Sequence, residues 1–298
     1  MTARLFKRGC KVTVYNTQPV GFVASNPQFF QLLPNAVEIT DLRIQFKIEK
    51  SLDSTPNAAT ITITNAADRT RALFQTKPLI VRLDAGLDGD LRHVFTGDVR
   101  YAPSEQKPPD WETIVQLGDG DRAYRYARAN VSYKAGTSVV TALKAAAAAM
   151  GLQLNPDIAA SADLQQQFAT GRSLHGPARD ELTKLLAPFG YSWSFQDGKL
   201  QILKDQNATP ATALAINSDN GMRGSPIYGT PDKNGTPPTL NVKMELYPAV
   251  TPGCQIYVTS KTINGIFRVS KLTHTGDTHG DPWTTEVEAL PVSGASLA

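Results

Sequence analysis

Hydrophobic and polar residues alternate with a period of two along the early part of the chain. In residues 42–49 every second side chain is apolar, which places four of them on one face: Leu42, Ile44, Phe46 and Ile48. Residues 59–64 repeat this period with β-branched side chains, which suit a pleated surface. Further strands are expected at 79–83, 91–101 and 111–117. Short strands separated by turn signals predict a β-barrel or β-sandwich.

The period changes to that of helices in the middle of the chain. Apolar residues at helical spacing predict one helix over 139–150 and a second over about 178–186. Alternation returns at 191–195 and 200–202, where a hairpin is expected. Residues 122–205 are therefore expected to form a small α+β module.

The pattern divides the chain into five parts. The expected order is an N-terminal extension at 1–36, a first β region at 37–121, the α+β module at 122–205, a connection rich in glycine and proline at 206–239, and a second β region with a frayed tail at 240–298. The extension matches no recognisable pattern, and it is interpreted as an extra strand, an arm or a partner-binding segment.

Two stretches, residues 95–117 and 267–290, echo each other. In each, a phenylalanine lies sixteen residues before a tryptophan: Phe95 before Trp111 and Phe267 before Trp283. A proline and an aspartate directly precede each tryptophan, and an alternating strand pattern follows it. Both stretches are therefore predicted to form the same hairpin, with a long polar loop and a tryptophan at the start of the second strand.

Composition supports folded domains rather than disorder. The chain has 298 residues, of which 41% are hydrophobic and 19% charged, so two or three domains are expected. Its 30 basic and 27 acidic residues give a net charge of +3, which is too balanced to indicate nucleic-acid binding. The densest basic run, Arg122, Arg125 and Arg128, is interpreted as an exposed strand or turn. No segment has the length or apolarity of a signal peptide or a membrane span.

Nothing in the sequence predicts a catalytic centre. The chain lacks a glycine-rich phosphate loop, a nucleophile elbow and the spacings of common metal sites. Cys10 and Cys254 stand far apart and fit a protein made without disulfides in a reducing cytoplasm. No catalytic, cofactor-binding or metal-ligating residue is therefore assigned, and no cofactor is expected.

Two polar clusters offer weaker signals. His274, Asp277 and His279 could hold a metal from one loop, but they lack a fourth donor and a rigid helix. A second cluster is acidic and comprises Asp84, Asp88 and Asp90. It lacks the twelve-residue loop of a calcium site, so turn chemistry explains it better.

Short motifs in three places carry a resemblance to a known family. The first runs through 47–50, 55–57 and 61–65, and the second is 135–137 followed by the helix over 139–150. The third and strongest lies near the C-terminus and includes Gly265, Phe267, Val269, Leu272, His274, Gly276, Asp277, Trp283 and Glu286. Together they resemble the baseplate hub proteins of tailed bacteriophages and contractile injection systems, the phage late control protein D-like group.

The resemblance implies a structural role. Members are homotrimers in which each chain supplies two tube-like β-barrels, here 37–121 and 240–290, so that three chains form a pseudo-sixfold ring. The expected function is a phage baseplate hub, not an enzyme, that joins the sixfold tail tube to a threefold central spike or fibre. Expected partners are further copies of the chain, the tail tube or distal tail protein, the spike or fibre protein and the tape-measure protein. No nucleic-acid specificity and no membrane span are expected, and the expected location is the virion, after synthesis in the host cytoplasm.

The alternative is a glycan-binding or glycan-cleaving tail component. Sugars stack on exposed aromatic rings, and four aromatic side chains are candidates: Trp111, Trp283, Tyr191 and Trp193. Burial of the tryptophans discriminates between the two hypotheses. Tryptophans in the core favour a structural hub, and exposed tryptophans favour a glycan-binding component. A generic intracellular β-sandwich adaptor is a third reading, but it does not explain the echo.

Overall fold

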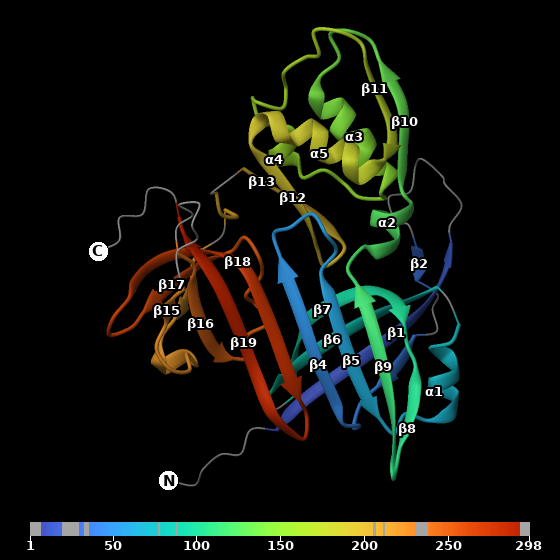
Figure 1. Ribbon diagram of the computed structural model, residues 1–298, viewed down its shortest axis with the longest axis vertical. Helices are drawn as coiled ribbons and strands as arrows, with labels where there is room; N and C mark the ends of the chain where they lie inside the picture. The colour runs from blue at the N-terminus through green and yellow to red at the C-terminus, as the bar shows by residue number, and fades with distance from the viewer. Residues whose placement is uncertain are drawn as a thin grey trace.

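The computed structural model describes residues 7–19, 30–32, 36–76, 78–87, 89–204, 207–210, 212–229 and 238–292. Most of these residues lie in antiparallel strands, so the prediction of a mainly β chain is confirmed. Three clusters of buried hydrophobic residues organise the fold, drawn mainly from 10–117, 123–202 and 216–289. In Figure 1 the helical module stands at the top, and the strands of the two β regions lie side by side below it.

The first β region is one curled antiparallel sheet. Its elements are β1 (Arg8–Pro19), β2 (Phe30–Leu32), β3 (Val37–Ile39), β4 (Ile44–Ser51), β5 (Ala58–Thr64), α1 (Asp68–Leu73), β6 (Leu79–Leu87), β7 (Asp90–Tyr101), β8 (Ser104–Lys107) and β9 (Asp110–Gly118). The strands follow the order β4, β5, β9, β7, β6, β1 and β2 across the sheet. Residues 8–19 thus form an extra strand, one of the three alternatives for the N-terminal extension.

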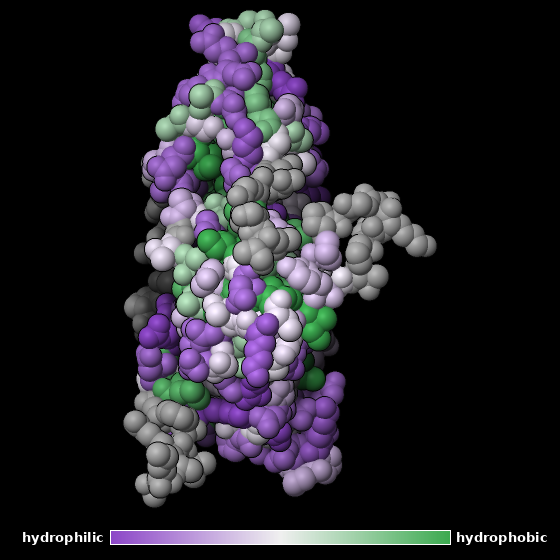
Figure 2. Space-filling model, turned by 90° about the vertical axis from the view of Figure 1, so that its left-hand side faces the viewer, coloured by the Kyte–Doolittle hydropathy of each residue, from purple (hydrophilic) through white to green (hydrophobic). Residues whose placement is uncertain are grey.

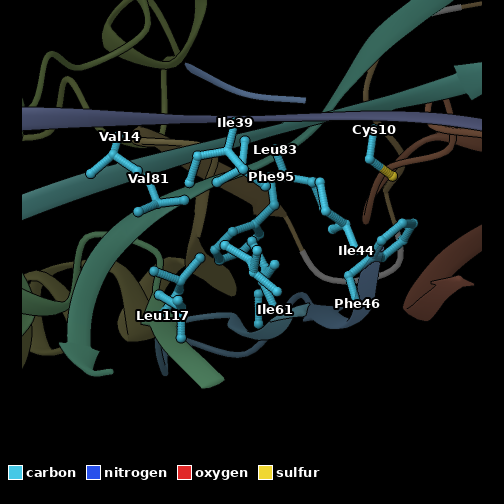
Figure 3. Packing of buried hydrophobic residues seen from close by; sticks show 14 of the residues in the cluster. Cys10, Val14, Ile39, Ile44, Phe46, Ile61, Val81, Leu83, Phe95 and Leu117 are labelled. Atoms are coloured by element: carbon cyan, nitrogen blue, oxygen red, sulfur yellow. The ribbon is translucent and has the colours of Figure 1, made fainter. Parts of the chain in front are cut away.

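Alternation along the strands builds the core of this region. Ile44, Phe46 and Ile48 of β4 are at most 3% exposed, as their spacing predicts. Figure 3 shows Ile44 and Phe46 in one cluster with side chains from other strands, such as Leu83 of β6. Each buried aliphatic side chain contributes about 1.5–3 kcal/mol to folding, which makes this cluster the main source of stability for the sheet.

The α+β module contains two small two-stranded antiparallel sheets packed on helices, of which β12–β13 is a hairpin. Its elements are α2 (Asp121–Tyr126), β10 (Arg128–Tyr133), α3 (Val139–Ala149), α4 (Pro156–Ala159), β11 (Arg172–Pro177), α5 (Ala178–Leu186), η1 (Ala187–Phe189), β12 (Tyr191–Gln196) and β13 (Lys199–Lys204). The Ser138 side chain caps α3 by accepting a hydrogen bond from the Thr141 N–H, and Gly151, with a φ of 67°, follows the end of the helix. Both predicted helices and the predicted hairpin are therefore present.

The second β region adds to the same sheet. Its elements are β14 (Leu214–Ile216), η2 (Ser218–Asn220), β15 (Ile227–Tyr228), β16 (Leu240–Glu245), β17 (Gln255–Thr259), β18 (Asn264–Asp277) and β19 (Gly280–Pro291). Two short strands, β14 and β15, come from the segment that the sequence marks as a connection. Antiparallel pairing of β18 with β4 joins both regions into a 15-stranded sheet.

The echo in the sequence is realised as two long hairpins, but their loops are short. β18 and β19 are separated by Thr278 and His279 alone, and β8 and β9 by Pro108 and Pro109. The prediction of long polar loops was therefore wrong. The polar residues belong to the strands themselves, because threonines such as those around His274 have a high β propensity; they lie half-buried on the face opposite His274.

No helix in the described ranges is long and apolar enough to cross a membrane.

Candidate functional site: the seam between the two β regions

The seam is the contact between β4 and β18, where the second β region joins the first. Residues 271–277 of β18 pair in register with residues 45–51 of β4. Polar groups and one aromatic ring fix both ends of this pairing.

Trp283 stabilises the seam by packing into the hydrophobic core of the first β region. It lies on β19 but is 1% exposed and belongs to the hydrophobic cluster of the first region. Its ring meets Phe46 of β4 edge-on, with the ring centroids 5.8 Å apart and the planes at 70°. The indole of the second region is thereby inserted into the core of the first.

Gly276 makes room for this aromatic contact. It pairs with Trp283 across the hairpin and with Phe46 across the seam. A Cβ atom at Gly276 would lie 2.3 Å from Cζ of Phe46 and 3.0 Å from Cε3 of Trp283, which is closer than such atoms can approach. The backbone of β18 therefore passes directly beneath the two rings, and only glycine fits there.

Asp277 fastens the tip of the hairpin to β4. Its carboxylate accepts hydrogen bonds from Nη2 of Arg43 (2.7 Å), Nε2 of Gln45 (2.9 Å) and the His279 N–H (2.9 Å). Burial alone would raise the pKa of Asp277, but the hydrogen bonds from Arg43, His279 and Gln45 outweigh it, and the pKa lies below its usual value. Asp277 is therefore a charged anchor of the seam.

The N-terminal strand clamps the same tip from the other side. Arg8 of β1 donates to the carbonyl of Gly280 and, at 2.8 Å, to the carboxylate of Asp281. Its guanidinium also lies over the Trp283 ring, 5.6 Å from the centroid. Elements from the beginning and the end of the sequence thus meet around one hairpin tip.

His274 lies in the middle of the seam and is fully buried. Its Nδ1 atom is 2.8 Å from Oγ1 of Thr285 on the neighbouring strand. Burial, helped by the charge of Lys50, lowers the pKa of His274 to about 3, so the imidazole is neutral near neutral pH. His274 is therefore part of the packing of the seam.

A second polar cluster fastens the α+β module to the sheet. Lys50, the inward-facing residue at the end of β4, is 2% exposed and binds both carboxylate oxygens of Asp197 at 2.7–2.8 Å. Asp197 and Gly198 form the turn between β12 and β13, and their N–H groups donate to the buried carboxylate of Asp119 at 2.6 and 2.8 Å. Burial first, and then the neighbouring Asp197, raise the pKa of Asp119 to about 7.

The predicted metal ligands do not converge. His274 points into the core, Asp277 is occupied by donors from Arg43 and Gln45, and His279 is exposed. In the acidic cluster, Asp84 pairs with Arg82 and Asp90 pairs with Arg92, whereas Asp88 lies outside the described residues. Over the described ranges, no three histidine, cysteine, aspartate or glutamate side chains gather as metal ligands would.

Both cysteines are buried. Burial raises the pKa of the Cys254 thiol and raises that of the Cys10 thiol to about 12.

Two of the four candidate glycan-binding aromatic residues are buried in cores, and the other two are half-buried. Trp283 and Trp193 are 1% and 4% exposed, and Trp193 donates a hydrogen bond to Thr183. Tyr191 is half-buried and contacts Ser161 through its hydroxyl group. Trp111 is also half-buried, and Arg71 covers one face of its ring at 4.2 Å. The aromatic residues thus form no exposed platform.

The basic run is divided among several partners. Arg122 pairs with Asp98, and Arg125 pairs with Asp121. Arg128, at the start of β10, is exposed and has no described ion-pair partner.

Sequence reasoning missed Arg8, Lys50 and Asp119. Lys50 left a signal, because it continues the inward face of Ile44, Phe46 and Ile48 where an apolar residue is expected. The other two left none, since their importance depends on contacts between residues that are far apart in the sequence.

Comparison with known proteins identifies the fold. No protein-family model matches the chain, and no curated protein matches its sequence. Three solved structures share the fold. The 43 kDa tail protein of prophage MuSo2 from Shewanella oneidensis has a TM-score of 0.61 and 8% identity, covering 96% of this chain and 97% of that one. A tail protein from Neisseria meningitidis has a TM-score of 0.59 and 13% identity, covering 94% and 96%.

The third similar structure belongs to a secretion system. The E. coli c3393 protein, described as a type VI secretion component with structural similarity to the T4 bacteriophage tail proteins gp27 and gp5, has a TM-score of 0.55 and 12% identity. The match covers 85% of this chain and 74% of that one. At these identities the likeness shows the fold, which this chain shares with phage tail proteins and a contractile secretion component.

Proposed function

We propose that this protein is a structural baseplate hub of a bacteriophage tail or a related contractile machine. In this role three copies form a ring that joins a sixfold tail tube to a threefold central spike or fibre. The observation that carries the proposal is the pair of similar hairpins, β7–β9 and β18–β19, held in one sheet by a rigid seam. The shared fold with phage tail proteins supports it.

The physical basis is symmetry matching. A chain with two similar β regions presents six similar units when three copies close into a ring. Such a ring can contact sixfold and threefold partners on its two sides. The angle between the two β regions, held at the seam by Trp283, would then define the curvature of the ring. The proposed partners are the tail tube or distal tail protein, the spike or fibre protein and the tape-measure protein, and the proposed location is the virion.

The ends of the sheet are suited to contacts between copies. The strand order begins at β15 and ends at β2. On β15, Ile227 is 66% exposed. On β17 and β18, the paired residues Tyr257 and Ile266 are 45% and 38% exposed. Figure 2, which views the side that carries β15 and β17, shows hydrophobic residues reaching the surface. A ring needs two different complementary surfaces on each chain, and in the proposed ring the two ends of this sheet would supply them.

Light scattering after size exclusion tests the ring. The monomer mass is 32.2 kDa, and the wild type should elute at about three times this value. Ile227→Glu should reduce the mass to that of a monomer, because it places a charge in the contact. Tyr126→Glu is the matched control, because Tyr126 is 75% exposed on α2, which belongs to neither end strand of the sheet. A monomeric wild type, or a trimer that survives Ile227→Glu, would contradict the contact.

A glycan-binding tail component is a second proposal, and it now depends on Trp111 alone. One face of that indole is covered by Arg71, so only a sugar on the opposite face is compatible. Calorimetric titration with cell-wall polysaccharide, comparing wild type and Trp111→Ala, tests it.

A further inference from the structure

The strands β10 and β11, at the far end of the α+β module, form a two-stranded sheet of their own. One of its faces packs on α3 and α5 through buried residues such as Ala129 and Leu174. On the other face three side chains of β10 are exposed, namely Arg128, Asn130 and Ser132. In the described part of the chain only β11 pairs with β10, so the two-stranded sheet has an open edge.

The register shows which backbone groups face that edge. The Ala178 N–H donates to the carbonyl of Ala127, which makes 127 and 178 a hydrogen-bonded pair. Hydrogen-bonded and non-hydrogen-bonded pairs alternate along an antiparallel ladder. The N–H and C=O groups of Arg128, Asn130 and Ser132 therefore point away from β11, and no described residue bonds to them.

The open edge is also basic. Between residues 122 and 156 the sequence has five basic residues and no acidic one. Arg128 begins β10 and Lys134 directly follows it, and neither has a described ion-pair partner. Arg172, also without a described ion-pair partner, begins β11 opposite Tyr133 of β10. Nε of Arg172 is a buried donor with no acceptor among the described residues.

We propose that the free edge of β10 binds an extended, acidic segment of a partner protein by adding a strand to the β10–β11 sheet. The outward N–H and C=O groups would supply the main-chain hydrogen bonds of such an addition. The three cations would supply its preference for acidic side chains. This inference is independent of the proposed ring.

The opposite edge, on β11, is less suitable. Its outward groups belong to Ser173, His175 and Pro177, and Pro177 has no N–H to offer. Native edges are commonly protected in this way. β10 contains no proline, so its edge can bond along its whole length.

Peptide selection on the full chain tests the proposal. A display library of random peptides of about twelve residues, long enough for one strand, is panned against the purified protein. Acidic sequences with alternating β-branched residues should be enriched. Asn130→Pro removes one outward N–H without touching the ladder to β11, and it should weaken the selected peptide about tenfold. Ser173→Pro on the other edge is the matched control and should bind like the wild type.

Hydrogen exchange on the wild type makes the test independent of these variants. Bound peptide should slow exchange at the amides of Asn130 and Ser132 and leave those of Ser173 and His175 unchanged. Failure to enrich acidic peptides, or protection elsewhere, would overturn the proposal. A single-stranded DNA oligonucleotide serves as a second probe. DNA binding that displaces the peptide, resists Asn130→Pro and is lost with Arg128→Glu would instead assign the surface to phosphates.

Discussion

The two echoing hairpins share their residue spacing and antiparallel pairing, but one packs into a single hydrophobic core and the other into two. In β7–β9 the inward residues, such as Phe95 and Leu117, enter the first hydrophobic cluster only. In β18–β19 the base, with Phe267 and Val287, enters the third cluster, whereas Trp283 near the tip enters the first. The second hairpin is thus a bridge between two cores. Similar sequences give similar hairpins, but the neighbours of each hairpin decide what its residues do.

The largest expected difference concerns the two tryptophans. Trp283→Ala should lower the free energy of unfolding by about 3–5 kcal/mol, because it leaves a cavity beside Phe46. Trp111→Ala should cost about 1 kcal/mol or less, since that ring is half-buried beneath Arg71. Denaturant titration of both variants measures this difference. Equal losses would show that the hairpins are equivalent.

Gly276 sharpens the comparison at the level of the backbone. Gly276→Ala should destabilise the protein by about 1–3 kcal/mol, because the new methyl group collides with Phe46 and Trp283. Gly280→Ala, in the same hairpin, meets only an ordinary contact at 3.7 Å with Asp277 and should cost less. Thermal unfolding of both variants measures this difference. A loss of stability confined to Gly276→Ala would support the close approach of the β18 backbone to the two rings.

Asp277 and Glu105 occupy corresponding positions in the two hairpins. Asp277→Asn should cost about 1–3 kcal/mol, because Arg43 and Gln45 lose a buried charged acceptor. Glu105→Gln, at an exposed position, should be nearly neutral. The folded pKa of Asp277 is lowered, so its contribution is present above about pH 4 and is lost as pH falls through the folded value. Chemical denaturation at neutral and acidic pH measures the free energy of unfolding of both variants. The two values should converge in acid, because Glu105→Gln keeps the Asp277 carboxylate and loses its contribution there.

His274 should give the smallest effect at neutral pH and a growing one in acid. Its folded pKa of about 3 lies below the usual value of about 6.5, so the unfolded chain binds the proton first. Stability should therefore fall by about 1 kcal/mol for each pH unit below about 6.5. His274→Gln should reduce this slope, whereas the exposed His279→Gln should leave it unchanged. Identical slopes in both variants would show that another group dominates.

The sequence predicted local structure well, because alternation and helical spacing depend on near neighbours. The inward face of β4, both main helices and both hairpins follow from such patterns. Threonine-rich strand ends were mistaken for loops, and β10 and β11 were missed because small polar residues hide their alternation.

The seam could not be predicted, because it joins distant parts of the chain. Pairing of β4 with β18, the insertion of Trp283 and the contacts of Arg8 depend on side chains more than two hundred residues apart. The sequence singled out individual residues of the seam, such as Phe46 and Trp283, but it gave no sign that they meet.

The position of Trp283 also determines how late in synthesis the first hydrophobic core can be completed. Val12 and Val14 of the first core emerge from the ribosome early, whereas the indole that completes this core is made more than two hundred and fifty residues later. Long-range contacts of this kind slow folding and leave hydrophobic surface open in the meantime. The first β region therefore cannot mature while the rest is being made, and the chain must reach its native state largely after translation, as one cooperative unit.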